Sequence, residues 1–192
     1  MPLMTDALML VDVVPGIGRN LGIAIANPSP VTNYVTLTLR DETGTVAGTA
    51  VTVALQPEQQ LARFVNELLP SATGVAFRGT LKLQSSTPIA VLGLRFTGNE
   101  CSTLSVTGAE VNTGATSIVI PQFAMAGGWA TQFELVNTTG STATGRIDIF
   151  DQSGNPMPVR LNGVTRSTFS YAIAPGGVFT LAPRDANGQS PF

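Results

Sequence analysis

The sequence predicts an all-β protein made of two tandem immunoglobulin-like antiparallel β-sandwiches, of which the second is shorter. Short runs of Val, Ile, Leu and Thr alternate in polarity, and Gly, Pro, Asn and Asp separate them at the spacing expected of a sandwich. In addition, residues 8–44 align without a gap on residues 118–154. Repeated β-modules usually serve architecture rather than chemistry. We therefore expect a first β-sandwich module over residues 1–112 and a second over residues 113–192.

The two copies share residue class, spacing and turn chemistry, although their sequence identity is low. The aligned positions are Leu8-Met9-Leu10 with Ile118-Val119-Ile120, Gly18 with Gly128, Ile23, Ile25 and Asn27 with Phe133, Leu135 and Asn137, and Leu37 and Leu39 with Ile147 and Ile149. The turn DETG (41–44) falls on DQSG (151–154). Because three kinds of signal agree, they predict two copies of one β-module.

The strands of the first copy are predicted from runs of alternating polarity. They cover residues 7–14, 20–27, 34–40, 45–55, 59–64, 77–85, 89–96 and 101–107. Successive side chains of a strand point to opposite faces, so alternate residues should enter the core. The residues expected inside are Val35, Leu37 and Leu39, and in the second copy Ile147 and Ile149. Those expected outside are Tyr34, Thr36, Thr38 and Arg40, and in the second copy Arg146 and Asp148.

Two kinds of local signal interrupt the strands. Asp41 and Asp151 each begin a four-residue segment that ends in glycine, and such segments are expected to close hairpins because Asp initiates turns and Gly tolerates a positive φ. Residues 66–70 predict one helical turn, with Asn66 as the candidate cap and Pro70 ending the run. The helical turn is too short to change the fold class.

The two copies diverge after residue 54. Pro57 matches Pro175, and these prolines lie 175 − 57 = 118 residues apart against the earlier offset of 118 − 8 = 110, which predicts eight inserted residues and a longer hairpin. The first copy then continues through two strong strands, 77–85 and 89–96, joined by Ser85-Ser86-Thr87-Pro88. Nothing in the second copy corresponds to them. Three readings remain open: a smaller sandwich whose edge is supplied by 160–181, a sequence that ends early, or completion by another chain.

Composition argues against several function classes. Only 11% of residues are charged, the net charge is −2 and Lys82 is the sole lysine, so no basic stripe exists to bind a nucleic acid backbone. No apolar run approaches the roughly 18–20 residues of a membrane-spanning helix. The N-terminus lacks the basic region and cleavage site of a signal peptide, so we expect a processed or recombinant piece or a chain made without export.

The residue types needed for catalysis are scarce. The chain contains no histidine and one cysteine, Cys101, which excludes an internal disulfide and predicts an inert, half-buried thiol near a strand start. We expect no enzyme activity, no catalytic or metal site and no cofactor. Acidic residues near loops leave calcium binding as a weaker alternative to turn and surface roles. These residues are Asp41, Glu42, Glu110, Asp148 and Asp151. A paired-carboxylate glycosidase is disfavoured.

Trp129 is the one aromatic residue that raises the question of a ligand. A lone tryptophan in a sandwich usually packs into the core or an interface, which is our expectation. The alternative is a sugar-binding platform, with Phe133 and Tyr171 as companions. Asn137-Thr138-Thr139 matches a glycosylation sequon, but we expect Asn137 to serve its turn.

Several longer segments resemble modules that occur in tandem in large secreted proteins of environmental bacteria. The first-copy segments are GIAIANPSP, LQPEQQLARFVNELLP and FRGTLKLQSSTPIAVLGLRF, and those of the module that commonly follows are GGWATQFELVNTTGSTATGRIDIFDQSGNPM and FSYAIAPGGVFTL. These modules are immunoglobulin-like or fibronectin-like. The resemblance implies an extracellular or cell-surface setting and a role as spacer, adhesion or assembly element, and it brings no catalytic residues. Further strands would normally follow the second copy.

Together these observations predict a non-enzymatic extracellular structural module. A sandwich that lacks two strands exposes apolar core and unpaired backbone groups, and a strand from another molecule would repair both. The expected partners are therefore a second copy, in a filament or surface layer, or a neighbouring module. Residues 1–14 are a candidate donor strand, although they align with 111–124 and can instead belong to their own module. The alternative function is a carbohydrate-binding or adhesive module.

Overall fold

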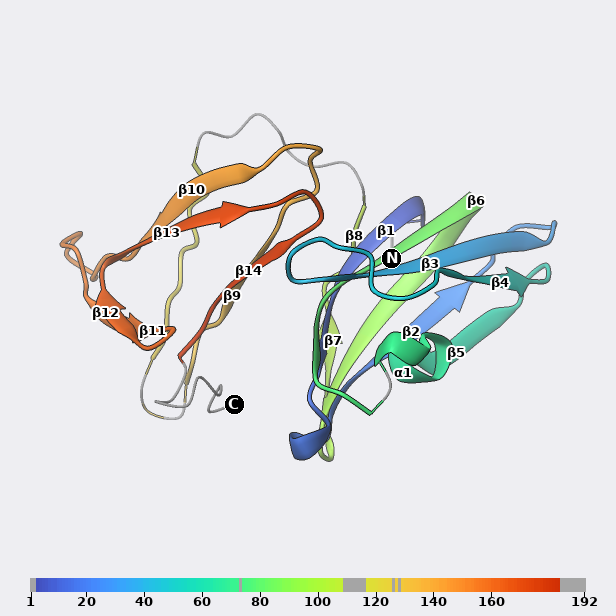
Figure 1. Cartoon of the computed structure of the whole chain (residues 1–192), viewed down its shortest axis with the longest axis horizontal. Helices are drawn as coiled ribbons and strands as arrows, with labels where there is room; N and C mark the ends of the chain where they lie inside the picture. Colours follow the sequence, from blue (N-terminus) through green and yellow to red (C-terminus); the bar gives the residue numbers. More distant parts are fainter. Residues whose placement is uncertain (1–2, 73, 109–116, 126, 128, 184–192) are drawn as a thin grey trace. The chain divides into compact units, whose positions relative to one another are not determined.

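The computed structural model describes residues 3–72, 74–108, 117–125, 127 and 129–183 (Figure 1). The chain divides into two compact units, Met1–Val111 and Asn112–Phe192. The expected all-β class is confirmed, because strands predominate in the described residues and α1, Val65–Leu68, is a helix of 4 residues. The immunoglobulin-like sandwich topology stays a prediction.

Unit one is organised around one large antiparallel sheet. Its strands are β1 (Leu3–Val13), β2 (Arg19–Ala26), β3 (Asn33–Asp41), β4 (Val51–Leu55), β5 (Gln60–Phe64), β6 (Phe77–Thr97), β7 (Glu100–Leu104) and β8 (Thr107–Gly108). The hydrogen-bonded order is β4-β3-β6-β1-β8, while β2 pairs with β5 and β6, and β7 pairs with β6. Two 3-10 turns, η1 (Pro15–Ile17) and η2 (Pro70–Ala72), complete the described elements of this unit.

Strand β6 connects most of unit one (Figure 1). It pairs with β1, β2, β3 and β7, and its 21 residues form a single strand. The prediction of two strands joined by a turn at 85–88 is therefore wrong. The backbone there stays extended because side chains bond its polar groups: Asn33 and Ser85 donate to the carbonyl of Thr87 at 2.9 and 2.8 Å. The register with β1 shifts opposite this stretch, between Met4 and Asp6.

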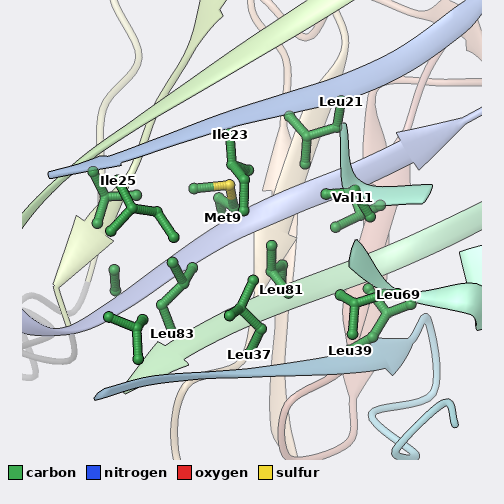
Figure 2. Close-up of a cluster of buried hydrophobic side chains, with 14 of the residues drawn as sticks. Met9, Val11, Leu21, Ile23, Ile25, Leu37, Leu39, Leu69, Leu81 and Leu83 are labelled. Atoms are coloured by element: carbon green, nitrogen blue, oxygen red, sulfur yellow. The ribbon is translucent and has the colours of Figure 1, made fainter. Parts of the chain in front are cut away.

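The core of unit one consists mainly of alternate residues from these strands, together with residues in and beside α1 such as Leu69. The labelled members in Figure 2 are Met9, Val11, Leu21, Ile23, Ile25, Leu37, Leu39, Leu69, Leu81 and Leu83. The alternation predicted for 34–40 is confirmed, since Val35, Leu37 and Leu39 are at most 1% exposed whereas Tyr34 is 61% exposed. Complete burial of one such aliphatic side chain contributes about 1.5–3 kcal/mol. The strands are therefore held together mainly by their inward faces.

The predicted helical turn is present, but its cap lies two residues earlier than expected. Phe64 occupies the N-cap position of α1, and its backbone N–H donates to Glu67 Oε2 at 2.8 Å. Asn66 is not the cap; its side-chain oxygen accepts from Asn20 Nδ2 at 3.2 Å. Glutamate three residues after the cap satisfies one backbone donor of the first turn, which explains why the helix starts there.

Unit two is built from three two-stranded pairs in its described residues. The strands are β9 (Phe133–Val136), β10 (Ala143–Asp148), β11 (Val159–Leu161), β12 (Val164–Arg166), β13 (Thr168–Ile173) and β14 (Val178–Leu181). β10 pairs with β13, β11 with β12, and β9 with β14. Ile149, Leu161, Phe169 and Leu181 form the buried cluster. Ile147 packs against this cluster, whereas the Arg146 side chain is 70% exposed, so the predicted alternation is confirmed here too.

Strand pairing confirms the internal repeat from residue 26 onward. β2 pairs with β5 through Ala26 and Gln60, and β9 pairs with β14 through Val136 and Val178. From unit one to unit two, the residue number of the first partner rises by 136 − 26 = 110 and that of the second partner by 178 − 60 = 118. The pairs β3·β4 and β10·β13 keep the same two offsets. The eight inserted residues are the hairpin β11·β12, so the predicted longer hairpin is also confirmed.

The inserted hairpin closes on the end of β14. Its turn has positive φ at Asn162 (47°) and Gly163 (79°), which is the geometry of a two-residue hairpin loop. The Asn162 side chain donates to the carbonyl of Thr180 at 2.8 Å and accepts from the N–H of Ala182 at 3.1 Å. Leu161 is fully buried. The insertion therefore belongs to the core of unit two.

Candidate functional site

Asn27 fixes the joint between β2 and the turn that follows β4. Its Nδ2 donates to the carbonyls of Val31, Leu55 and Gln56 at 2.8, 3.1 and 3.1 Å. Its Oδ1 accepts from the N–H of Ser29 at 3.1 Å. The side chain is buried, so its polar atoms need partners within the protein, and these bonds supply them.

Asn137 makes the corresponding contacts in unit two. Its Nδ2 donates to the carbonyls of Ser141 and Ile173 at 2.7 and 2.8 Å, and its Oδ1 accepts from the N–H of Thr139 at 3.0 Å. The residue is 3% exposed. The expectation that Asn137 serves its turn is confirmed, because both amide hydrogens of the side chain are already bonded.

The two aspartate turns are also equivalent. Asp41 Oδ1 accepts from the backbone N–H groups of Thr43 and Thr45 at 2.9 and 3.0 Å. Asp151 Oδ1 accepts from the N–H of Asn155 at 2.8 Å. The Thr43 hydroxyl lowers the pKa of Asp41, and the Asn155 N–H lowers the pKa of Asp151. These contacts fit a hairpin turn.

Calcium binding gains no support from the remaining acids. No group of three metal-ligating side chains occurs among the described residues. Asp148 lies on β10 beside Arg146, and Glu42 lies 3.7 Å from Arg78. Glu110 lies outside the described residues.

A buried ion cluster joins β1, β2 and β6. Arg19 donates to Asp12 at 2.8 Å, and Arg78 lies 3.5 Å from the other oxygen of the same carboxylate. The side chains of Arg19 and Asp12 are 2% and 10% exposed. Burial of charges is costly unless they are paired, and here the ion pairs link residues of three strands. Sequence reasoning missed it, because strand pairing alone brings these residues together.

Cys101 and Trp129 depart from their expected burial. Cys101 lies in β7, near the strand start as predicted, but it is exposed rather than half-buried. Trp129 is 70% exposed, so the expectation of a core position is wrong, and a position in an interface stays a prediction. Its proposed companions contact other rings: Phe133 stacks on Phe123, and Tyr171 packs at a tilt against Phe179.

The feature of unit two that differs most from unit one is an open strand edge. In unit one, β3 bonds β4 on one side and β6 on the other. Its counterpart β10 bonds β13, and no strand of the described residues bonds its second side. Along β10, Arg146 donates to Asp148 at 2.9 Å, and the Thr168 hydroxyl donates to the same carboxylate at 2.9 Å. The Thr168 bond and then Arg146 lower the pKa of Asp148, which favours its charged form.

The segment of unit two that aligns with β1 is exposed. Ile118, Val119 and Ile120 are 84%, 85% and 56% exposed and lie in no strand. Their counterparts, residues 8–10, lie in β1, where Met9 is 2% exposed. The alignment predicts a strand at 118–120, and this prediction is wrong for a physical reason: β1 is held by β6, and no described strand of unit two replaces β6.

The described residues contain no helix that is long and apolar enough to cross a membrane.

Comparisons with known proteins assign no family. No family model matches the chain, and no curated protein matches it. Among solved structures, the crystal structure of Thermotoga maritima 1070 is similar at 14% identity and a TM-score of 0.40, covering 56% of this chain and 93% of that chain. A likeness at this level carries no argument about fold or function.

Proposed function

We propose that this chain is a non-enzymatic extracellular structural module made of two immunoglobulin-like repeats, whose second unit is completed by a strand from another molecule. The observation that carries this proposal is the open edge of β10. In unit one the corresponding edge, that of β3, is occupied by β6. The extracellular setting rests on the resemblance to secreted bacterial modules.

Two features of unit two favour strand addition. An unpaired strand edge presents backbone N–H and C=O groups to any extended chain. Segment 118–120 of the same unit exposes three consecutive aliphatic side chains. Proteins avoid such features or use them for binding, and an added strand would satisfy the backbone groups of β10.

The donor decides the architecture of the assembly. A second copy as donor creates a contact between unlike surfaces, and such contacts propagate into filaments or layers unless they close into a ring. A neighbouring module as donor creates a discrete complex. Residues 1–14 are not a free donor, because β1 (Leu3–Val13) pairs with β6 along its length.

The proposal is tested on the full chain by light scattering over a concentration series, with negative-stain microscopy of the heaviest fraction. Hydrogen exchange of β10 is measured with and without a peptide matching residues 77–96. Growth in mass with concentration, or new protection of β10, supports strand addition. A monomer at every concentration whose β10 amides stay unprotected rejects it. Deleting residues 1–7 is a poor test, because Asp6 and Ala7 pair with β6 and the deletion would unfold unit one.

A carbohydrate-binding or adhesive module is the second candidate, favoured by the exposure of Trp129. Exposed tryptophan rings can stack on apolar faces of ligands. Because Trp129 is the chain's single tryptophan, its emission reports directly on this position. A glycan array followed by fluorescence titration tests the idea, with Trp129→Ala as the control. Unchanged emission on addition of every array hit would reject a Trp129 platform.

A further inference from the structure

We propose that the strand completing unit two belongs to a neighbouring module and follows the apolar alternation of β6, with a neutral residue at the position of Arg78 and a cation at the position of Lys82. This inference rests on the proposed function. It derives the chemistry of the partner strand from the pairing of β6 inside unit one, which serves as the template.

The register of β6 defines the vacant position beside β10. In unit one, Leu83 pairs with Leu37 and Lys82 pairs with Thr38. The repeat offset of 110 places Ile147 at the position of Leu37 and Asp148 at the position of Thr38. An incoming strand with the same register therefore sets an apolar residue beside Ile147. Its next residue in the N-terminal direction lies beside Asp148.

The position beside Asp148 favours a cation. In unit one the neutral Thr38 faces Lys82, and the Lys82 Nζ instead lies 3.1 Å from Asp6 on β1. In unit two the acidic residue is Asp148 on β10 itself, and its side chain is 31% exposed beside Arg146. Directly opposed opposite charges on antiparallel strands stabilise pairing, and like charges oppose it. Lysine or arginine is therefore preferred at this position of the incoming strand, and an acidic residue is disfavoured.

The position of Arg78 favours a neutral residue. The Arg78 side chain is 18% exposed in unit one and lies within 3.5 Å of Asp12 and 3.7 Å of Glu42. With the offset of 110, the counterpart of Glu42 is Gln152, in the equivalent turn. An arginine inserted here would lose the acidic partner that Glu42 supplies in unit one, and partial burial of an unpaired charge is costly. A polar neutral side chain can hydrogen-bond to glutamine without that cost.

These charges make β6 of a second copy a poor donor. It carries the favourable Lys82 but also Arg78, and Arg78 would lose both of its acidic partners. In addition, β6 already pairs with β1, β2, β3 and β7 of its own unit, and leaving it would break all four contacts. A strand of matching pattern in a neighbouring module carries neither cost.

The test measures binding of labelled peptides covering residues 77–88 to the full chain by fluorescence anisotropy. Three peptides are compared: the native sequence, R78Q and K82E, with a scrambled native peptide as control. We expect R78Q to bind roughly two- to five-fold more tightly than the native peptide, and K82E to bind roughly two- to five-fold more weakly. Hydrogen exchange should place the added protection on β10 and leave β3 unchanged.

Variants of the chain assign the preference to Asp148. Asp148→Asn should reduce the difference between the native and K82E peptides, and Asp148→Lys should reverse it. Because Asp148→Lys also disturbs Arg146, the milder Asp148→Asn keeps the test valid if the lysine variant misfolds. Equal affinities of the three peptides for the native chain, or tighter binding of K82E, would overturn the inferred charge pattern.

The same measurements separate failure of this inference from failure of the proposed function. If no peptide binds but the chain grows in mass with concentration, unit two takes a strand of other chemistry from a second copy, and only the present inference is wrong. If no peptide binds, β10 stays unprotected and the chain remains monomeric, both are wrong.

Discussion

Asn27 and Asn137 hold the same joint in the two units, although few residues around them are identical. The backbone N–H of Asn27 donates to the carbonyl of Gln59 at 2.9 Å, and that of Asn137 donates to the carbonyl of Gly177 at 3.1 Å. The side-chain amide of Asn27 donates to the carbonyl of Leu55 at the end of β4, and that of Asn137 donates to the carbonyl of Ile173 at the end of β13. An asparagine suits this position because one amide group can donate to and accept from a single turn.

Replacement of Asn137 by alanine should destabilise unit two by about 1–3 kcal/mol, because the carbonyls of Ser141 and Ile173 lose their donor within a buried joint. Urea unfolding followed by hydrogen exchange of each unit measures the loss. Gln152→Ala, an exposed substitution in the same unit, is the matched control. Equal stability of the two variants would show that the joint contributes nothing.

The repeat and its turns could be predicted from sequence because they depend on local chemistry. Asp41 and Asp151 begin turns whose geometry is set within five residues, and the contacts of Asn137 with Thr139 and Ser141 are equally local, unlike its bond to Ile173. The continuous course of β6 could not be predicted. Pro88 indicates a break in the strand, and the sequence does not reveal that Asn33 bonds the backbone beside it. The ion cluster and the open edge of β10 also depend on which strands become neighbours.

The lowered pKa of Asp151 makes unit two sensitive to acid. A carboxylate whose pKa is lower in the folded than in the unfolded state stabilises the fold at pH values above the unfolded pKa, near the ordinary 3.8. This stabilisation is lost as the pH falls through the lower, folded value. We expect Asp151→Asn to flatten the decline of unfolding free energy of unit two below about pH 4. Titration of urea midpoints between neutral and acidic pH checks this, with Gln152→Ala as control. An unaltered acid slope would contradict it.

Gly79 allows β3 and β6 to approach closely. A Cβ at this position would overlap the carbonyl oxygen of Arg40 and lie 2.9 Å from its carbonyl carbon. Because both are backbone atoms in a strand pair, neither can move without breaking the pairing. Gly79→Ala should therefore destabilise unit one by more than about 3 kcal/mol, among the large effects of single substitutions. Gly16→Ala, where a Cβ meets nothing within 4 Å, should leave the thermal midpoint almost unchanged. Similar midpoints for the two variants would refute the close approach.

Leu161 anchors the inserted hairpin in the core of unit two. Leu161 is fully buried with Ile149, Phe169 and Leu181, whereas Val164, on the facing strand of the hairpin, is 43% exposed. Truncation of a buried leucine to alanine costs about 2–5 kcal/mol, because it removes apolar contacts and leaves a cavity. Leu161→Ala should lower the unfolding free energy of unit two by that amount, and Val164→Ala should change it by less than about 0.5 kcal/mol. Denaturant unfolding of both variants measures the difference. If both lost the same stability, the hairpin would act as a surface addition, and unit two would depend on the elements it shares with unit one.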